Sequence, residues 1–267
     1  VMAILVLALA ALALRWRVHR LVHRQRQLEI QVHERTRELE EASLTDPLTG
    51  LRNRRYFTEH IDADVAWAVR RHDEARRHAR AAADDADLVF VLVDIDHFKR
   101  VNDLHGHAAG DVALRHVARC LQGALRESDT LVRWGGEEFL VVARGLARAW
   151  ATELAERVRR SVHEQPLALP DGTELRCTVS VGFAAFPMDP GQPQAQGWSD
   201  AIRVADAALY LAKRAGRDGW AGVVGTLPGH ELDPQERRPA REWLASGELA
   251  LLRSTPRDAP SGRPETG

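Results

Sequence analysis

Residues 88–111 read LVFVLVDIDHFKRVNDLHGHAAGD, and this stretch decides which kind of fold the chain can adopt. It begins with a continuous apolar run rich in β-branched residues, which is typical of a central strand buried on both faces. Asp94 closes the run. A carboxylate at the end of a buried strand costs free energy unless it is paired or bound to a metal. Asp94 is therefore a candidate site residue, with a cap or a turn as its alternative role.

The sequence on either side of this strand mixes helical and strand patterns. Two strand-like runs, 130–134 and 138–143, flank Gly135-Gly136, which predicts a hairpin with a tight turn. Residues 174–186 alternate like a strand. Helical patterns cover 61–87, which is polar and peripheral in character, and also 111–126, 147–162 and 198–215. The mixture predicts an α+β fold.

The composition is that of a globular protein, with 45% hydrophobic and 28% charged residues in a chain of 267. The net charge of -1 gives no basic field, so a nucleic-acid partner is not expected. Cys120 and Cys177 stand in unrelated contexts, without the spacing of a zinc site or a disulfide framework. Any phosphate ligand must therefore be met by a local group of cations.

The two ends of the chain have a different character from its middle. Residues 1–14 are apolar and arginines follow them at once, the order at the cytoplasmic end of a membrane helix, although a full span needs about 20 residues. We expect a membrane helix that is possibly truncated; the alternative is a buried or partner-facing apolar helix. Residues 15–43 carry a weak heptad pattern, which predicts a coiled-coil linker or, alternatively, a single amphipathic helix. Residues 222–267 are rich in Pro and Gly, and we expect disorder there, with at most a short helix near 242–252.

Several polar residues beyond the buried strand suit a nucleotide. Asn102 and Asp111 can offer amide and carboxylate groups to the edge of guanine, and Lys99 is a mobile cation suited to phosphate. The hairpin tip places two adjacent carboxylates, Glu137 and Glu138, directly after two glycines, which let a ligand lie against the backbone. A strand that starts at this tip would point the two carboxylates to opposite faces.

Four motifs together resemble a known family. The stretch 133–139, RWGGEEF, resembles the signature loop of GGDEF-domain diguanylate cyclases, in the variant with Glu at the third position. The stretches TDPLTGLRNRR (45–55), DIDHFKRVND (94–103) and ADAALYLAKRAGRDG (205–219) are similar to further motifs of this family, in the same order. The resemblance covers residues 44–221. It implies a palm-like α+β domain with a central antiparallel sheet flanked by helices.

The resemblance also implies roles for individual residues. Asp94, Glu137 and the backbone carbonyl of Ile95 would ligate two Mg²⁺ ions, with Mn²⁺ as a possible substitute, and oxygen ligands suit such ions. Glu137 would also assist deprotonation of the ribose 3′-hydroxyl, with Lys99 and Glu138 as further catalytic residues. The implied substrate-binding residues are Phe98, Asn102, His107, Asp111, Gly135, Gly136, Lys213 and Arg217. Lys213 and Arg217 are four residues apart, which would put both cations on one face of a helix.

The implied activity joins two GTP molecules into cyclic di-GMP and two pyrophosphates, which needs two domains face to face and therefore a homodimer. The stretch RESD, 126–129, resembles an inhibitory product site, with Arg126 and Asp129 as ligands of cyclic di-GMP and Arg157 as a secondary contact. The expected location is the bacterial inner membrane, with the catalytic domain in the cytoplasm. Three alternatives stay open: a catalytically silent sensor that binds GTP or cyclic di-GMP, a dimerising scaffold, and a cyclase with another product.

Overall fold

A computed structural model describes residues 15–20, 23–24, 26–27, 44–78, 86–169, 172–230 and 238–254. The chain divides into two compact units, Val1–Leu44 and Thr45–Gly267. In the first unit, the described residues between 15 and 27 are helical. The expected membrane helix, 1–14, and most of the expected coiled coil, 15–43, lie outside the described residues. Among the helices that are described, none combines the length and the apolar character that a membrane span requires.

The second unit is built on a seven-stranded sheet with the strand order β1-β3-β4-β2-β7-β8-β9. Its strands are β1 (Arg52–Asn53), β2 (Leu88–Ile95), β3 (Thr130–Gly135), β4 (Glu138–Arg144), β7 (Val179–Phe186), β8 (Trp220–Thr226) and β9 (Leu249–Arg253). The short strands β5 (Leu167–Ala168) and β6 (Glu174–Leu175) form a separate pair.

The sheet is mixed, which corrects the expectation of an antiparallel one. The strands β3, β4, β2 and β7 pair with one another antiparallel, whereas β1 runs parallel to β3 and β8 runs parallel to β7. Parallel neighbours need a crossover connection, and helix α6 (Trp198–Arg214) provides it between β7 and β8. The α+β class itself is as expected.

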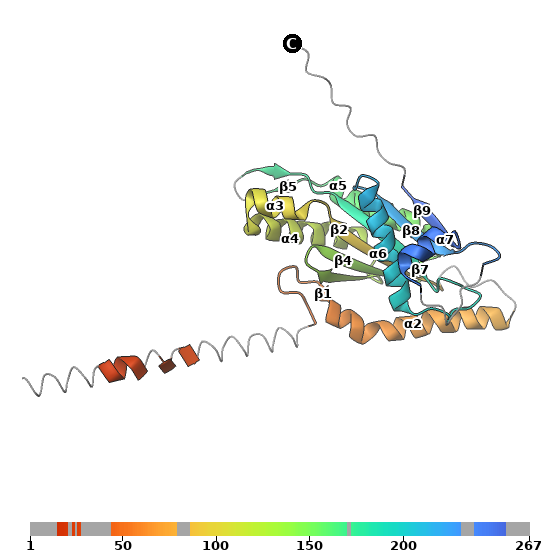
Figure 1. Ribbon diagram of the computed structural model, residues 1–267, viewed down its shortest axis with the longest axis horizontal. Helices are drawn as coiled ribbons and strands as arrows, with labels where there is room; N and C mark the ends of the chain where they lie inside the picture. The colour runs from red at the N-terminus through yellow and green to blue at the C-terminus, as the bar shows by residue number, and fades with distance from the viewer. Residues whose placement is uncertain are drawn as a thin grey trace, which may run out of the picture. The chain divides into compact units, whose positions relative to one another are not determined.

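Helices cover both faces of the sheet (Figure 1). The helices are α2 (Arg54–Arg77), α3 (Phe98–His105), α4 (His107–Ala124), α5 (Ala151–His163), α6 and α7 (Ala240–Ser246), with the 3-10 turn η1 (Arg148–Trp150) before α5. Apolar residues of α4 and α5 pack on one face, and those of α2, α6 and α7 pack on the other. The sheet is therefore the middle layer of three.

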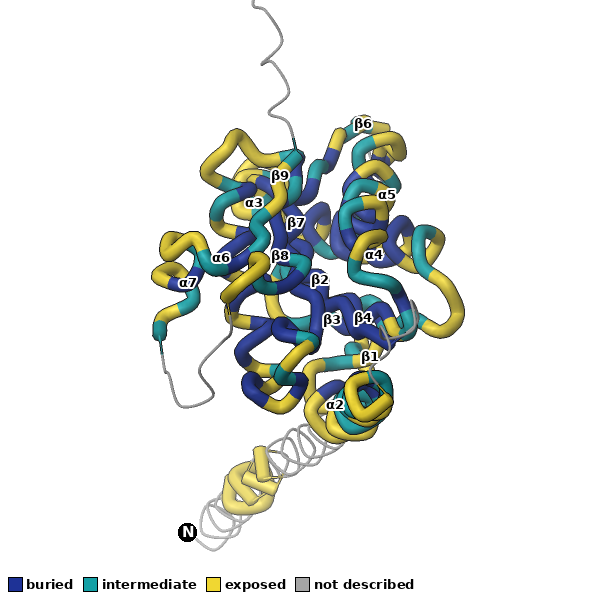
Figure 2. Tube along the Cα trace, turned by 90° about the vertical axis from the view of Figure 1, so that its right-hand side faces the viewer, coloured by how far each residue is buried: buried dark blue, intermediate teal, exposed yellow. Residues whose placement is uncertain are grey.

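Strand β2 lies at the centre of this arrangement, as its sequence predicted. All eight of its residues are buried. Val89, Val91 and Val93 face the α4/α5 side, and the residues between them face the α2/α6 side. Figure 2 shows β2, β4 and β7 as the buried centre of the unit. Gly182 on β7 lets α6 approach closely, because a Cβ there would lie 2.1 Å from the Ala205 carbonyl oxygen.

The expected disorder after residue 221 is wrong for the residues that the structure describes. Strand β8 continues to Thr226, and α7 and β9 follow, with β9 antiparallel to β8. Trp243 is 2% exposed and packs in the α2/α6 core with Leu249. These apolar side chains pack here although the segment is rich in Pro and Gly. The helix expected near 242–252 is α7 followed by a strand, and residues 231–237 and 255–267 lie outside the described part.

Helix α2 begins earlier and is less peripheral than expected. It starts at Arg54, where the Asn53 side chain caps the helix by accepting a hydrogen bond from the Tyr56 backbone N–H at 3.0 Å. Its inward face buries Phe57 and Ile61 in the core. The sequence pattern did not reveal this start, because most of the residues between Arg54 and Ile61 are polar.

Candidate active site

The centre of the candidate site is Asp94, at the end of β2. It lies opposite Glu138 on β4 and Ser180 on β7, and it is 6% exposed. The Lys213 Nζ atom of α6 lies 2.7 Å from its Oδ2 atom. Burial raises the pKa of Asp94, and the negative charges of Glu137 and Asp96 add to this, although Lys213 partly opposes it. The site therefore has more negative charge than its one paired lysine neutralises.

The β3–β4 hairpin brings the other two carboxylates to Asp94. The Ile95 backbone N–H donates to the Glu137 carbonyl oxygen at 3.4 Å, which joins the hairpin tip to the end of β2. Burial raises the pKa of Glu138, and the charge of Asp94 raises it further. Glu137 contributes to the pKa of both other carboxyl groups. Both glutamates of the hairpin therefore lie within the electrostatic reach of Asp94.

An ion pair between Arg133 and Asp46 holds the hairpin tip in place. The Arg133 guanidinium donates to both oxygens of Asp46, at 3.0 and 2.9 Å, and to the Gly136 carbonyl oxygen at 2.9 Å. Gly136 has φ +52, which favours glycine. Asp46 and Arg133 lie in two of the family motifs, but neither residue was expected to have a role in the site. Their partnership joins positions 87 residues apart, so local sequence contains no signal for it.

The two candidate guanine ligands lie on helices that pack against each other. Asn102 is on α3 and Asp111 is on α4, and Gly106 with φ +80 separates the helices. Gly110 makes their approach possible, because a Cβ there would lie 1.9 Å from the Asn102 Oδ1 atom. The Asn102 side chain therefore lies against α4, one residue from Asp111. The role of Gly110 was missed, because the helical pattern found in the sequence begins one residue later, at Asp111, whereas α4 begins at His107.

Comparisons with known proteins identify this arrangement. A family model described as "Diguanylate cyclase, GGDEF domain" matches residues 43–219. The chain belongs to the GGDEF diguanylate cyclase family. The diguanylate cyclase DgcP of Pseudomonas aeruginosa is 38% identical over 186 residues, which are 70% of this chain and 25% of DgcP.

Two solved structures extend the comparison. The GGDEF domain of TpbB from P. aeruginosa is 34% identical, with a TM-score of 0.52 over 65% of this chain and 91% of that chain. The GGDEF domain of DgcB from Caulobacter crescentus, solved in complex with c-di-GMP, is 32% identical, with a TM-score of 0.54 over 66% of this chain and 90% of that chain. The chain spans between a quarter and about half of the length of the first curated relatives it matches.

Within this GGDEF domain, the candidate phosphate ligands are not arranged as expected. Helix α6 ends at Arg214, so Arg217 lies beyond the helix, in a loop where it has φ +64. Lys213 and Arg217 therefore do not share a helix face. The exposed Lys99 lies in the first turn of α3, beside the half-buried Phe98, and the exposed His107 begins α4.

A metal ion would find oxygen ligands here. Across the described residues, no group of three or more His, Cys, Asp or Glu side chains is close enough to hold an ion by itself. Mg²⁺, however, is commonly held by one or two carboxylates together with water and substrate phosphates. Burial raises the pKa of Asp94, and a divalent cation bound beside it would favour the ionised carboxylate. Asp94, Glu137 and the Ile95 carbonyl therefore fit the expected ligand set in chemistry.

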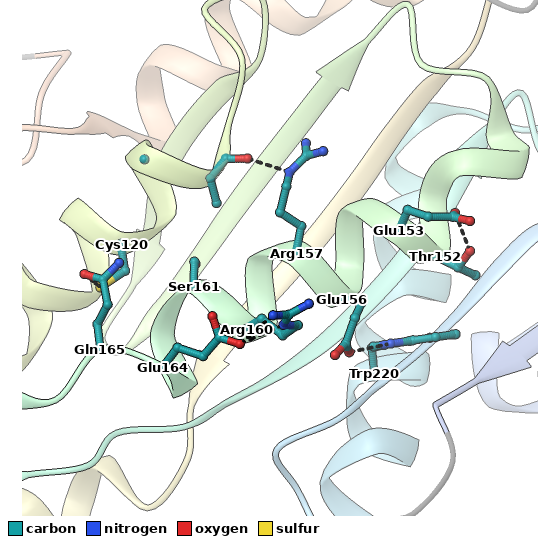
Figure 3. Close-up of a pocket in the computed structure, with 12 residues that line it drawn as sticks. Cys120, Thr152, Glu153, Glu156, Arg157, Arg160, Ser161, Glu164, Gln165 and Trp220 are labelled. Carbon is teal, nitrogen blue, oxygen red and sulfur yellow. Dashed lines mark hydrogen bonds and ion pairs between the residues drawn. The ribbon is translucent and has the colours of Figure 1, made fainter.

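The candidate inhibitory site lies at the other end of α4. Arg126 and Asp129 line a hollow of about 390 Å³ together with residues 50–52 and Gln122. The Asp129 Oδ2 atom accepts from the Arg126 backbone N–H at 2.9 Å, which closes the turn. Arg157 instead lines a second hollow, of about 690 Å³, beside α4 and α5, where its Nε atom donates to the Ala124 carbonyl oxygen at 2.8 Å (Figure 3). The structure thus brings Arg126 and Asp129 together and places Arg157 in a separate hollow.

Proposed function

We propose that this chain is a diguanylate cyclase, which condenses two GTP molecules into cyclic di-GMP with release of two pyrophosphates. The observation that carries the proposal is the buried carboxylate Asp94, with Glu137 and Glu138 beside it and Lys213 against it, in a domain of the GGDEF family. Excess negative charge beside a lysine suits a site that receives cations together with a triphosphate.

Each GGDEF domain would hold one GTP. Asn102 and Asp111 would accept from the guanine N1–H and N2–H₂ groups. Lys213, Lys99 and Arg217 would neutralise the phosphates, and Gly135 and Gly136 would let the nucleotide lie against the hairpin tip. The ring closes only when the ribose of each GTP meets the phosphates of the other, so two copies of the domain must face each other.

In the reaction, the 3′-hydroxyl oxygen of one GTP bonds to the α-phosphorus of the other, and the bond from that phosphorus to the leaving pyrophosphate breaks. Mg²⁺, when bound by Asp94, Glu137 and the Ile95 carbonyl, would stabilise charge on the attacking and leaving oxygens. The Glu137 carboxylate would assist removal of the hydroxyl proton. Burial raises the pKa of Glu138, and the charge of Asp94 raises it further, which favours the protonated form of this neighbouring carboxyl group.

Further parts of the proposal concern regulation and location. Cyclic di-GMP would inhibit the enzyme by binding Arg126 and Asp129, with Arg157 as a contact from the adjoining hollow. The helical segment within residues 15–43 would hold two copies together, and the apolar residues 1–14 would attach the chain to the bacterial inner membrane with the domain on the cytoplasmic side. A variant that lacks residues 1–43 is expected to lose activity and dimerisation at low protein concentration; full retention of both would contradict this part.

The direct test is incubation of the purified chain with GTP and Mg²⁺, with the product identified by chromatography and mass. Glu137→Gln tests the acidic tip, and Glu164→Gln is the matched control, because Glu164 is an exposed glutamate directly after α5 that pairs with Arg160. We expect cyclic di-GMP from the wild type and from the control, and almost none from Glu137→Gln. If a folded, dimeric wild type gives no product but binds GTP, the silent sensor is the better account.

A further inference from the structure

The loop that follows α6 has an unusual backbone at the residue expected to bind phosphate. Three consecutive residues have positive φ: Gly216 at +121, Arg217 at +64 and Asp218 at +40. Glycine adopts such angles readily, whereas side chains other than those of Asn and Asp rarely do. A conformation of this kind persists only where surrounding groups determine it. The neighbours of this loop therefore decide where Arg217 lies.

The first of these neighbours is the end of β2. The Asp218 backbone N–H donates to the Oδ2 atom of Asp96 at 3.0 Å. Asp96 is itself buried and fixed, because it accepts from the Thr178 hydroxyl at 2.8 Å and from the Ser180 hydroxyl at 2.6 Å. Asp96 lies two residues after Asp94. The loop is thus attached to the strand end that carries the centre of the active site.

The second neighbour is a buried arginine of α5. Arg159 is 1% exposed, and its guanidinium lies 2.5 Å from the Asp218 Oδ1 atom. Its remaining nitrogens donate to Glu156 at 2.9 and 2.8 Å. Glu156 also accepts from the Trp220 indole N–H at 3.2 Å, a contact that Figure 3 shows. The Asp218 carboxylate has a further contact, with the His163 ring at 2.9 Å. The buried cation Arg159 therefore joins α5 to the loop at Asp218 and, through Glu156, to Trp220 at the start of β8.

A third attachment comes from the C-terminal strand. The Ser254 hydroxyl, directly after β9, accepts from the Trp220 backbone N–H at 2.9 Å, and the Ser254 backbone N–H donates to the Trp220 carbonyl at 2.9 Å. These contacts fix the residue at which the loop enters β8. The loop is therefore held on three sides by elements distant in sequence.

We propose that Arg159 and Asp218 are positioning residues for Arg217: their ion pair fixes the left-handed loop so that the Arg217 guanidinium meets the phosphates of GTP. A buried ion pair is a weak source of stability, because desolvation opposes its attraction, but it can fix one geometry. Arg159 has the geometry for this, since a planar guanidinium can hold Glu156 and Asp218 at once. The proposal rests on the proposed function, because it takes GTP as the ligand.

The test measures binding of a GTP analogue to the purified chain by titration calorimetry in the presence of Mg²⁺. The analogue has a methylene group between its α- and β-phosphates, so it cannot release pyrophosphate. In Asp218→Gly the carboxylate is lost but the left-handed backbone is free of strain. We expect about 10-fold weaker binding, the order for loss of one charge-assisted contact, and a smaller loss for Asp218→Asn, which keeps one acceptor.

The same substitution in an Arg217→Gln background separates positioning from stability. If Asp218 acts through Arg217, then Asp218→Gly weakens binding little further once Arg217 is neutral. Glu164→Gln, which removes an exposed ion pair of α5, is expected to bind as the wild type does. Thermal unfolding of every variant ensures that folded proteins are compared, and Asp218→Asn serves if Asp218→Gly does not fold.

Two results would overturn the inference: affinity equal to that of the wild type in a folded Asp218 variant, and an additive loss in the Arg217→Gln background. Synthesis of cyclic di-GMP by the wild type is measured in parallel. Product formation together with either result rejects the positioning role alone. If the Asp218 and Arg217 variants show the expected non-additive losses of binding but the wild type makes no product, the proposed activity alone is rejected.

Discussion

Asp46→Asn perturbs the anchor of the hairpin tip while changing the shape of the side chain little. The carboxylate receives two Arg133 contacts, at 3.0 and 2.9 Å, with the two side chains only 15% and 17% exposed. A hydrogen bond to a charged group contributes about 1.5–3 kcal/mol, and Asn keeps one acceptor, so we expect a loss of about 2 kcal/mol in the free energy of unfolding. In a unit of this size, that is a fall in Tm of about 4–8 °C.

The assay is urea unfolding followed by circular dichroism, with Glu59→Gln as the control. The Arg55–Glu59 pair is 53% and 44% exposed, so its loss should cost at most about 0.5 kcal/mol. Burial raises the pKa of Asp46, but the hydrogen bonds from Thr49 and Arg133 outweigh it, so the pKa is lowered on folding. Its stabilising effect is therefore lost as pH falls through the folded pKa, and the difference between wild type and Asp46→Asn should shrink in acid. Equal stabilities of Asp46→Asn and Glu59→Gln at neutral pH would refute the reasoning.

Three further predictions concern the site and the C-terminal strand. Lys213→Met removes the charge that lowers the pKa of Asp94, so that pKa should rise further. Binding of the GTP analogue with Mg²⁺ should therefore weaken, and on acidification it should be lost at a higher pH than in the wild type. An unchanged pH midpoint of binding in calorimetry would contradict this. Gly110→Ala places a Cβ 1.9 Å from the Asn102 Oδ1 atom, so GTP should bind at least about 10-fold more weakly, while Gly123→Ala, with open space around it, should not alter binding. Trp243→Ala should cost about 3–5 kcal/mol in urea unfolding, whereas a disordered segment would show almost no change.

The sequence predicted the elements whose pattern is local. The apolar run 88–94 and the strands around Gly135-Gly136 are recognisable within a few residues, because burial on both faces and turn chemistry each produce a local pattern. The same holds for Asp94, since an acidic residue that ends a buried strand is unusual in any context. The structure confirms these strands and places the carboxylates of the hairpin near Asp94.

Features that depend on distant contacts were missed. The C-terminal strand β9 has only five residues, and its pairing with β8 gives it a place that its own composition does not indicate. Arg217 was expected on a helix, yet the helix stops at Arg214, because contacts of Asp218 with Asp96 and Arg159 hold the following residues in another conformation. Such ion pairs join segments far apart in sequence, so no local periodicity reveals them.

The central claim is that this chain joins two GTP molecules in both directions. Its most direct test is the ratio of pyrophosphate released to cyclic nucleotide formed, measured with the purified chain, GTP and Mg²⁺. The account predicts two pyrophosphates for each cyclic di-GMP, with both lost together in Glu137→Gln. One pyrophosphate for each cyclic mononucleotide, or equal product from wild type and Glu137→Gln, would contradict it.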